Sequence, residues 1–341
     1  MDTSKTAPVA KTNLHLPQLG FGGASLGDMR ETITEAQASD TIETAYQSGI
    51  GYFDTSPWYG NGKSELRFGH VLRTKPRNSF ILSTKVGRVH QRPDNPDEYT
   101  HPAWKGGLPF EPRFDFTGPA ILKSYEMSMA RLGLNRVDAL LIHDLDPGHQ
   151  KDESGVAAGF QQLDESGMKT LASLKRADEI RAIGAGINVV GMIPRFLKHC
   201  DIDFFLVAMP YTLMDQSALK ELDECAARGI SIVIGAPFAS GILARGPSPE
   251  ATYGYRRALP EALDKARRLT NIAKSFDVDL GAAALQFPLA HPAVVSIIPG
   301  PTHSAEVIQN LVWAKSEIPA GFWKTLKAEK LIAENAPTPI E

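Results

Sequence analysis

The chain has 341 residues, 43% of them hydrophobic, and a formal net charge of −3 from 36 Lys and Arg against 39 Asp and Glu. This balance gives no basic footprint for nucleic acid and argues against binding to a membrane surface. The sequence contains no run of about 18 apolar residues that could cross a membrane, and its polar N-terminus, residues 1–9, lacks the apolar segment of a signal peptide.

Strand-like and helix-like segments alternate along the chain. Short apolar runs typical of buried strands recur at 50–54, 79–86, 137–143, 180–187, 203–208, 230–236 and 294–299. Helical patterns lie between them, for example at 34–48, 118–132, 168–177, 216–228 and 261–276. This alternation predicts a (β/α)8 TIM barrel, which suits the length. We expect a short eighth strand near 317–318 and an N-terminal β-hairpin at 13–20 that plugs the closed end.

Two long loops interrupt this alternation, at 87–117 and 237–258. Each follows a predicted strand, so both should leave the C-terminal face of the barrel, and the aromatic residues of the first predict an ordered lid. We expect one domain over 11–334, with flexible ends at 1–10 and 335–341. The two cysteines, at 200 and 225, have no metal-type spacing and indicate a reducing compartment, hence a cytoplasmic protein.

Four polar residues stand out. Asp54, Lys85 and His143 each lie at or just past the end of a predicted strand, and Tyr59 follows five residues after Asp54. In a TIM barrel these strand ends open onto the face where chemistry takes place. Singly, each residue has an ordinary structural explanation, such as a turn cap or a packed aromatic ring. Their joint occurrence favours a shared site instead.

The four side chains suit general acid–base catalysis. The tyrosine hydroxyl has an ordinary pKa of ~10, and an ammonium at Lys85, held by Asp54, should lower the pKa of Tyr59. His143 could then orient a carbonyl or hydroxyl oxygen beside Tyr59. The sequence has no HExxH motif and no paired cysteines, so we expect no metal, and we expect these four residues rather than a serine nucleophile to carry the chemistry. A cofactor that exchanges hydride would complete the reaction.

Several motifs together resemble those of the aldo-keto reductases. FDTSPWYG at 53–60 with GKSE at 62–65 is similar to the first family signature, STKVG at 83–87 to its lysine strand, and RLGL at 131–134 with LIHD at 141–144 to its histidine strand. The resemblance extends over about residues 14–332. It implies a TIM barrel with a nicotinamide cofactor across the open face. It also implies that Tyr59 is the acid or base, that Lys85 and Asp54 tune it, and that His143 orients the substrate.

The resemblance also carries over cofactor contacts, residue by residue. An Asn and an aromatic residue usually hold the nicotinamide, while a small-residue loop and a later helix start hold the pyrophosphate and the adenosine. The usual Gln of strand 5 and the usual Ser before the Asn are missing, since Ala208, Met209 and Ile187 stand there. The expected cofactor-binding residues are Asn188, Tyr211, Ala236, Pro237, Phe238, Ser240, Gly241, Leu243, Gly300, Thr302, Ser304, Glu306 and Asn310.

Two of these positions bear on the choice of cofactor. Members that use NADP carry basic residues where this chain has Gly300 and Glu306. A carboxylate repels a 2′-phosphate but accepts a hydrogen bond from a free 2′-hydroxyl. His303 is the only group nearby that could be cationic. We therefore expect NAD, with NADP the weaker cofactor.

The segments at 141–146 and 209–216 resemble, within the family, the D-threo-aldose 1-dehydrogenases and the related pyridoxal 4-dehydrogenase. This resemblance implies NAD-dependent oxidation of an aldose of the L-fucose, L-galactose or D-arabinose type at C1, giving a lactone. Pyridoxal, reacting as its cyclic hemiacetal to 4-pyridoxolactone, is the alternative. We expect Trp58, Trp104 and Phe114 to line the pocket for either small molecule, because aromatic rings stack on a pyridine or on the apolar face of a sugar.

Two other classes of function are alternatives. A regulatory barrel that binds nicotinamide without turnover is a minor alternative, since the four candidate catalytic residues are present and no added interaction domain is visible. A metal-dependent hydrolase lacks a ligand set.

Overall fold

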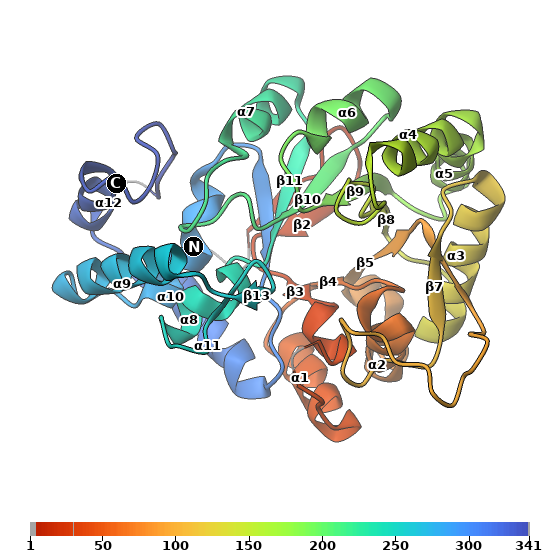
Figure 1. The fold of residues 1–341 in the computed structure, drawn as a ribbon, viewed down its shortest axis with the longest axis horizontal. Coiled ribbons are helices and arrows are strands. Elements are labelled where there is room, and N and C mark those ends of the chain that lie inside the picture. The colour runs from red at the N-terminus through yellow and green to blue at the C-terminus, as the bar shows by residue number, and fades with distance from the viewer. Residues whose placement is uncertain (1–4, 30, 340–341) are drawn as a thin grey trace.

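The computed structural model describes residues 5–29 and 31–339. Within them, eight strands form one parallel sheet in the order β14-β11-β10-β9-β8-β5-β4-β3. The sheet closes where Gly20 N donates to Ile297 O at 2.9 Å and Ile297 N donates to Gln18 O at 2.9 Å. Figure 1 shows the helices arranged around the outside of the strands. The expected (β/α)8 barrel is confirmed.

The elements follow the chain in regular alternation. The barrel strands are β3 (Phe21–Gly22), β4 (Tyr52–Asp54), β5 (Ile81–Val86), β8 (Ala139–His143), β9 (Ala182–Ile187), β10 (Phe204–Ala208), β11 (Ser231–Gly235) and β14 (Val294–Ile298). The helices are α1 (Glu35–Gln47), α2 (Lys63–Leu72), α3 (Gly118–Leu132), α4 (Glu153–Gln162), α5 (Met168–Arg176), α6 (Met192–His199), α7 (Leu219–Arg228), α8 (Ile242–Arg245), α9 (Pro260–Ser275), α10 (Leu280–Gln286), α11 (Ser304–Lys315) and α12 (Ala320–Ala328). No helix of the described residues is long and apolar enough to cross a membrane.

The seven predicted strands are all present, but the eighth was placed wrongly. Residues 317–318 lie in the connection between α11 and α12, and the eighth strand is β3 near the N-terminus. A Cβ on Gly22 would lie only 2.8 Å from Ile298 O, so this strand requires glycine where it passes its neighbour. A two-residue strand flanked by glycines has no apolar run to detect.

The N-terminal hairpin is present but begins earlier than expected. It consists of β1 (Thr6–Pro8) and β2 (His15–Pro17), paired antiparallel. A small apolar cluster joins the hairpin to inward-facing strand residues: Val9, Leu14, Leu16, Tyr52, Ala139, Leu141, Ala182, Phe204, Leu206, Val233, Val295 and Ile298. The hairpin thus closes the barrel interior, as predicted. The larger core lies between the strands and the surrounding helices.

The ends are less free than expected. Strand β1 falls within 1–10, and Ala336 of the C-terminal stretch is fully buried against the core. Residues 1–4 and 340–341 lie outside the described residues. The ordered unit is therefore longer than 11–334.

The loop 87–117 is an ordered structure over the barrel mouth. Its ends pair as the antiparallel strands β6 (Arg88–Gln91) and β7 (Glu111–Phe114). Its tip is held by Lys63, whose Nζ donates to Gly106 O at 2.8 Å and to Asp28 Oδ2 at 2.7 Å. The prediction of an ordered lid is confirmed.

A buried carboxylate stabilises the opposite end of the barrel. Asp138, which precedes β8, accepts hydrogen bonds from Leu82 N at 2.8 Å and from Arg77 Nη2 at 2.7 Å, and it also pairs with Arg181. Its side chain is 3% exposed. One carboxylate thereby ties β5, β8 and the residue before β9 together.

We predict that Asp138→Ala lowers the free energy of unfolding by about 3 kcal/mol, because it removes the acceptor of the buried Leu82 N–H and the carboxylate that pairs with two partly exposed arginines, Arg77 and Arg181. Equilibrium unfolding in urea measures the loss. The matched control Asp40→Ala, at an exposed position of α1, should change it by less than about 0.5 kcal/mol. Equal effects of the two substitutions would contradict this account.

Candidate active site

Asp54 and Lys85 form a buried ion pair at the C-terminal ends of β4 and β5. Lys85 Nζ donates to Asp54 Oδ2 at 2.6 Å and to Thr55 O at 2.8 Å, while Ser83 Oγ donates to Asp54 Oδ1 at 2.7 Å. Both charged side chains are about 1% exposed. Burial raises the pKa of Asp54 and lowers the pKa of Lys85, and the contact between the two opposes both shifts.

Tyr59 lies next to this pair, as predicted. Lys85 Nζ is 4.6 Å from the centre of the Tyr59 ring. Burial raises the pKa of the Tyr59 hydroxyl well above its ordinary value, and the carboxylates of Asp54 and Asp144 raise it further. Desolvation and the two carboxylates therefore act against the lowering of this pKa that was expected from Lys85.

His143 completes the group from the end of β8. Its ring centre is 5.9 Å from that of Tyr59, and the two rings are nearly perpendicular. Gly186 on β9 leaves the room for it, because a Cβ there would lie 3.2 Å from His143 Cδ2. Burial lowers the pKa of His143 well below its ordinary value, so the imidazole is neutral at physiological pH.

A network that sequence reasoning missed lies behind His143. Arg88 Nη1 donates to His143 Nδ1 at 3.0 Å, and Arg88 Nη2 donates to Asp144 Oδ2 at 2.8 Å. Asn188 Nδ2 donates to Asp144 Oδ1 at 3.0 Å. Arg88 stands three residues after Lys85, and its position at the start of a predicted lid was the only signal in the sequence.

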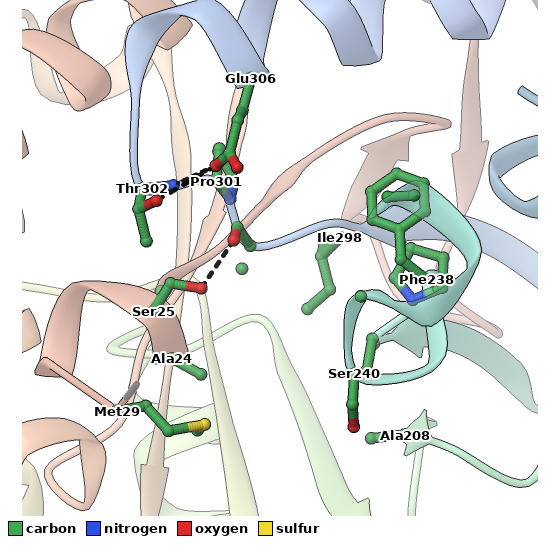
Figure 2. Close-up of a pocket in the computed structure, with 18 of the residues that line it drawn as sticks. Ala24, Ser25, Met29, Ala208, Phe238, Ser240, Ile298, Pro301, Thr302 and Glu306 are labelled. Carbon is green, nitrogen blue, oxygen red and sulfur yellow. Dashed lines mark hydrogen bonds between the residues drawn. The ribbon is translucent and has the colours of Figure 1, made fainter. Parts of the chain in front are cut away.

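A cavity of about 340 Å³ opens beside the cluster. Asp54 and Tyr59 line one part of it, and Glu306 and Asn310 of α11 line another. Figure 2 shows side chains from three regions facing it: Ala24, Ser25 and Met29 after β3, Phe238 and Ser240 after β11, and Pro301, Thr302 and Glu306 after β14.

Most of the expected cofactor-binding residues line this cavity, namely Ala236, Pro237, Phe238, Ser240, Gly241, Gly300, Thr302, Glu306 and Asn310. Four others lie elsewhere. Tyr211 is buried, with its ring stacked on Phe287 at 5.5 Å, and Asn188 is bonded to Asp144. Leu243 is a core residue, and Ser304 begins α11. The sequence reasoning missed a further set that lines the cavity: Gly22, Gly23, Ala24, Ser25, Met29, Glu31, Arg245, Tyr255, Gln309 and Trp313.

The loop after β11 contains several residues in the left-handed backbone region. Ala236, Ala239, Ser240 and Gly241 have φ values of 50°, 48°, 64° and 97°. The turn is closed by its own hydrogen bonds, from Ala239 N to Ala236 O at 2.9 Å and from Gly241 N to Phe238 O at 2.8 Å. The residues that the sequence predicts for the pyrophosphate therefore line the cavity, on a loop of small side chains that lets a bound group approach the backbone closely.

The far part of the cavity is acidic. Glu306 Oε2 accepts from Thr302 N at 2.7 Å, and Thr302 Oγ1 is 3.5 Å from Glu31 Oε1. Ser25 Oγ donates to Gly300 O at 2.6 Å, so β14 and the turn after β3 are joined here, as Figure 2 shows. Two carboxylates therefore flank Thr302.

The three expected substrate-contacting residues lie around Arg88 and Tyr59. The ring of Trp58 is 4.6 Å and that of Phe114 4.2 Å from the Arg88 guanidinium carbon. Trp104, from the lid, has its ring centre 6.0 Å from that of Tyr59 and is 2% exposed. Three aromatic rings therefore lie beside the candidate catalytic residues.

Asp144, Asp146 and His149 have the spacing of a metal-binding group within the described residues. Their ligand atoms already have partners, however. Asp144 binds Arg88 and Asn188, while Asp146 Oδ2 is 2.9 Å from His149 Nδ1. The pKa of His149 is raised, because the hydrogen bond to Asp146 and the two carboxylate charges outweigh its burial.

Comparison with curated proteins gives relatives over nearly the whole chain. Pyridoxal 4-dehydrogenase from Microbacterium luteolum is 35% identical over 347 residues, covering 98% of this chain and 99% of the relative. D-threo-aldose 1-dehydrogenase from a Pseudomonas species is 36% identical over 344 residues, covering 98% and 100%.

Solved structures share the fold. An aldo-keto reductase from Bacillus halodurans in its holo form superposes with a TM-score of 0.74 at 23% identity, covering 99% of this chain and 98% of the other. Glycerol dehydrogenase from Gluconobacter oxydans gives a TM-score of 0.72 at 19% identity, covering 100% and 98%. A sequence model described as the Aldo/keto reductase family matches residues 18–329. The chain therefore belongs to the aldo/keto reductase family of nicotinamide-dependent oxidoreductases that act on CH–OH groups.

Proposed function

We propose that this enzyme oxidises an aldose of the L-fucose, L-galactose or D-arabinose type at C1, with NAD, to the lactone. The observation that carries the proposal is the Asp54–Lys85–Tyr59 cluster at one part of a cavity that most of the expected cofactor-binding residues line. The names of the relatives at 35% and 36% identity support the substrate class. Oxidation of pyridoxal to 4-pyridoxolactone is the second candidate, because one of these relatives carries that name.

In this proposal the chain's own residues handle the proton at the reacting oxygen. His143 donates a hydrogen bond to the C1 hydroxyl, and Tyr59 takes the hydroxyl proton as the C–O bond becomes a carbonyl. Lys85, fixed by Asp54, provides the positive charge that stabilises the Tyr59 oxygen once it is ionised. The bound nicotinamide would supply the remaining chemistry by accepting a hydride from C1.

The acidic surroundings of Thr302 support NAD. A 2′-phosphate there would face the carboxylates of Glu31 and Glu306, whereas a ribose 2′-hydroxyl can donate to one of them. Arg245 also lines the cavity, but it belongs to α8, which follows the loop at 236–241 that we expect to hold the pyrophosphate, and not to the segment around Thr302.

We expect NAD reduction with L-fucose, L-galactose or D-arabinose, followed by the absorbance of the reduced cofactor, and a lactone by mass spectrometry. Turnover of pyridoxal alone would establish the second candidate in place of the first. NAD binding without turnover of any alcohol or aldehyde would contradict both and favour a regulatory role.

Tyr59→Phe should lower kcat at least about 10³-fold, because it removes the proton carrier. Binding of NAD, measured by fluorescence titration, should stay unchanged. The matched control Tyr46→Phe on α1, whose hydroxyl bonds Ser79 Oγ instead, should retain activity. Turnover retained in Tyr59→Phe would rule out the assigned role.

The pH profile of the wild type adds a second readout on Tyr59. The ionised hydroxyl is the base, and it is populated as the pH approaches a pKa that is raised. Oxidation should therefore still be increasing at the alkaline end of the measured range. A plateau reached below pH 7 would contradict this assignment.

Glu306→Lys should move the kcat/KM ratio toward NADP by about 10- to 100-fold, because it replaces a repulsion with a charge-assisted hydrogen bond to the 2′-phosphate. Glu306→Gln, which keeps an acceptor for Thr302 N, should give a smaller change. A wild-type enzyme that prefers NADP would overturn the assignment of NAD.

A further inference from the structure

Arg88 is an unusual neighbour for a candidate catalytic histidine. It is 4% exposed, and its guanidinium group is held between the rings of Trp58 and Phe114. An arginine buried this deeply is stable only if a carboxylate offsets its charge. Asp144 provides it, at 2.8 Å. Asp144 has φ 54°, in the left-handed region that Asp adopts more readily than most other non-glycine residues.

The hydrogen bond from Arg88 to His143 determines where the imidazole proton lies. Arg88 Nη1 is 3.0 Å from His143 Nδ1, and a guanidinium group can only donate. Nδ1 must therefore accept, with its lone pair toward Arg88. A neutral imidazole that accepts at Nδ1 carries its hydrogen on Nε2. That hydrogen is the one left to donate to another oxygen.

The charges that face His143 act on the same equilibrium. Arg88 and Lys85 disfavour the imidazolium ion, and His149 adds to them when it is protonated. Asp144 favours it, with Oδ1 at 3.5 Å from His143 Nε2, which is longer than a good hydrogen bond. Both oxygens of Asp144 already accept, from Arg88 and from Asn188. Arg88 thus opposes protonation of His143 Nδ1 in two ways. It occupies the Nδ1 lone pair, and it pairs with the Asp144 carboxylate that would otherwise balance the imidazolium charge.

Ser56 provides the competing arrangement. Its Oγ lies 3.2 Å from His143 Nδ1 and accepts a hydrogen bond from Trp58 N at 3.0 Å. If Arg88 were absent, Nδ1–H could donate to Ser56 Oγ, and the hydrogen would leave Nε2. Loss of the Arg88 side chain would therefore allow the other neutral tautomer, with the hydrogen on Nδ1.

We propose that Arg88 is a positioning residue that holds His143 as the neutral tautomer with its hydrogen on Nε2, and that Asp144 is the anchor of Arg88. The part of this inference that concerns turnover rests on the proposed function, in which His143 donates to the substrate oxygen. The tautomer itself does not depend on it.

The test is two-bond ¹H–¹⁵N NMR on protein labelled at histidine, with the His143 signal assigned from a His143→Gln sample. The wild type should show neutral His143 with hydrogen on Nε2 from pH 6 to 9. Arg88→Met should give either a second tautomer, in which Nδ1–H donates to Ser56 Oγ, or an imidazolium signal, because Asp144 is then an uncompensated carboxylate near the ring. Arg88→Lys, which restores a cation, should return part of the wild-type signal.

The double variant Arg88→Met/Asp144→Asn separates this effect from misfolding. Asn has nearly the same shape as Asp but no charge, so the double variant leaves no unpaired carboxylate and the fold should survive. The tautomer of His143 should no longer be fixed. A wild-type His143 with hydrogen on Nδ1, or an Arg88→Met protein with an unchanged tautomer and pH profile, would overturn the proposal.

Kinetics give the second readout. Arg88→Met should lower kcat/KM by about 10- to 100-fold, the worth of a charge-assisted hydrogen bond. It should also bring an acid limb into the pH profile, because a raised His143 pKa means that the imidazolium forms at higher pH. If the NMR result holds and turnover is unchanged, the tautomer assignment stands while the proposed role of His143 in turnover fails.

Discussion

The buried ion pair of Lys85 and Asp54 is the constraint on which the active end of this barrel depends. Two opposite charges, each about 1% exposed, sit on neighbouring strands and meet at 2.6 Å. Taking both from water costs several kcal/mol per ion, and an apolar pair of similar shape would often be at least as stable. The pair is therefore better explained by chemistry than by stability: it fixes a positive charge beside Tyr59.

The rest of the structure holds the Lys85 ammonium in place and shields it from water. Eight parallel strands bring β4, β5 and β8 to the same rim, and the lid from 87–117 covers it. Arg88, at the base of the lid, forms a second ion pair with Asp144 and reaches His143. One ion pair thus adjoins the tyrosine and the other the histidine; the first is made by Lys85 within β5 and the second by Arg88 at the start of β6.

The sequence predicted the barrel and the meeting of Asp54, Tyr59, Lys85 and His143, because apolar runs and strand-end polar residues are local signals. It missed β3, which is two residues long and relies on glycine packed against Ile298. For the same reason it missed the cavity wall from Gly22 to Glu31. The sequence could not predict that Tyr211 packs into the core or that Arg88 contacts His143 and Asp144. The direction of a side chain after a strand depends on tertiary packing.

The central claim, that this site moves hydride from a sugar carbon while a side chain takes the proton, is tested most directly by isotope transfer. L-fucose deuterated at C1 would be incubated with the enzyme and NAD, and the reduced cofactor analysed by mass spectrometry. The account predicts that the deuterium appears on the nicotinamide ring, with a slowed turnover if this step limits the rate. Deuterium found in the solvent, with unlabelled reduced cofactor, would contradict it.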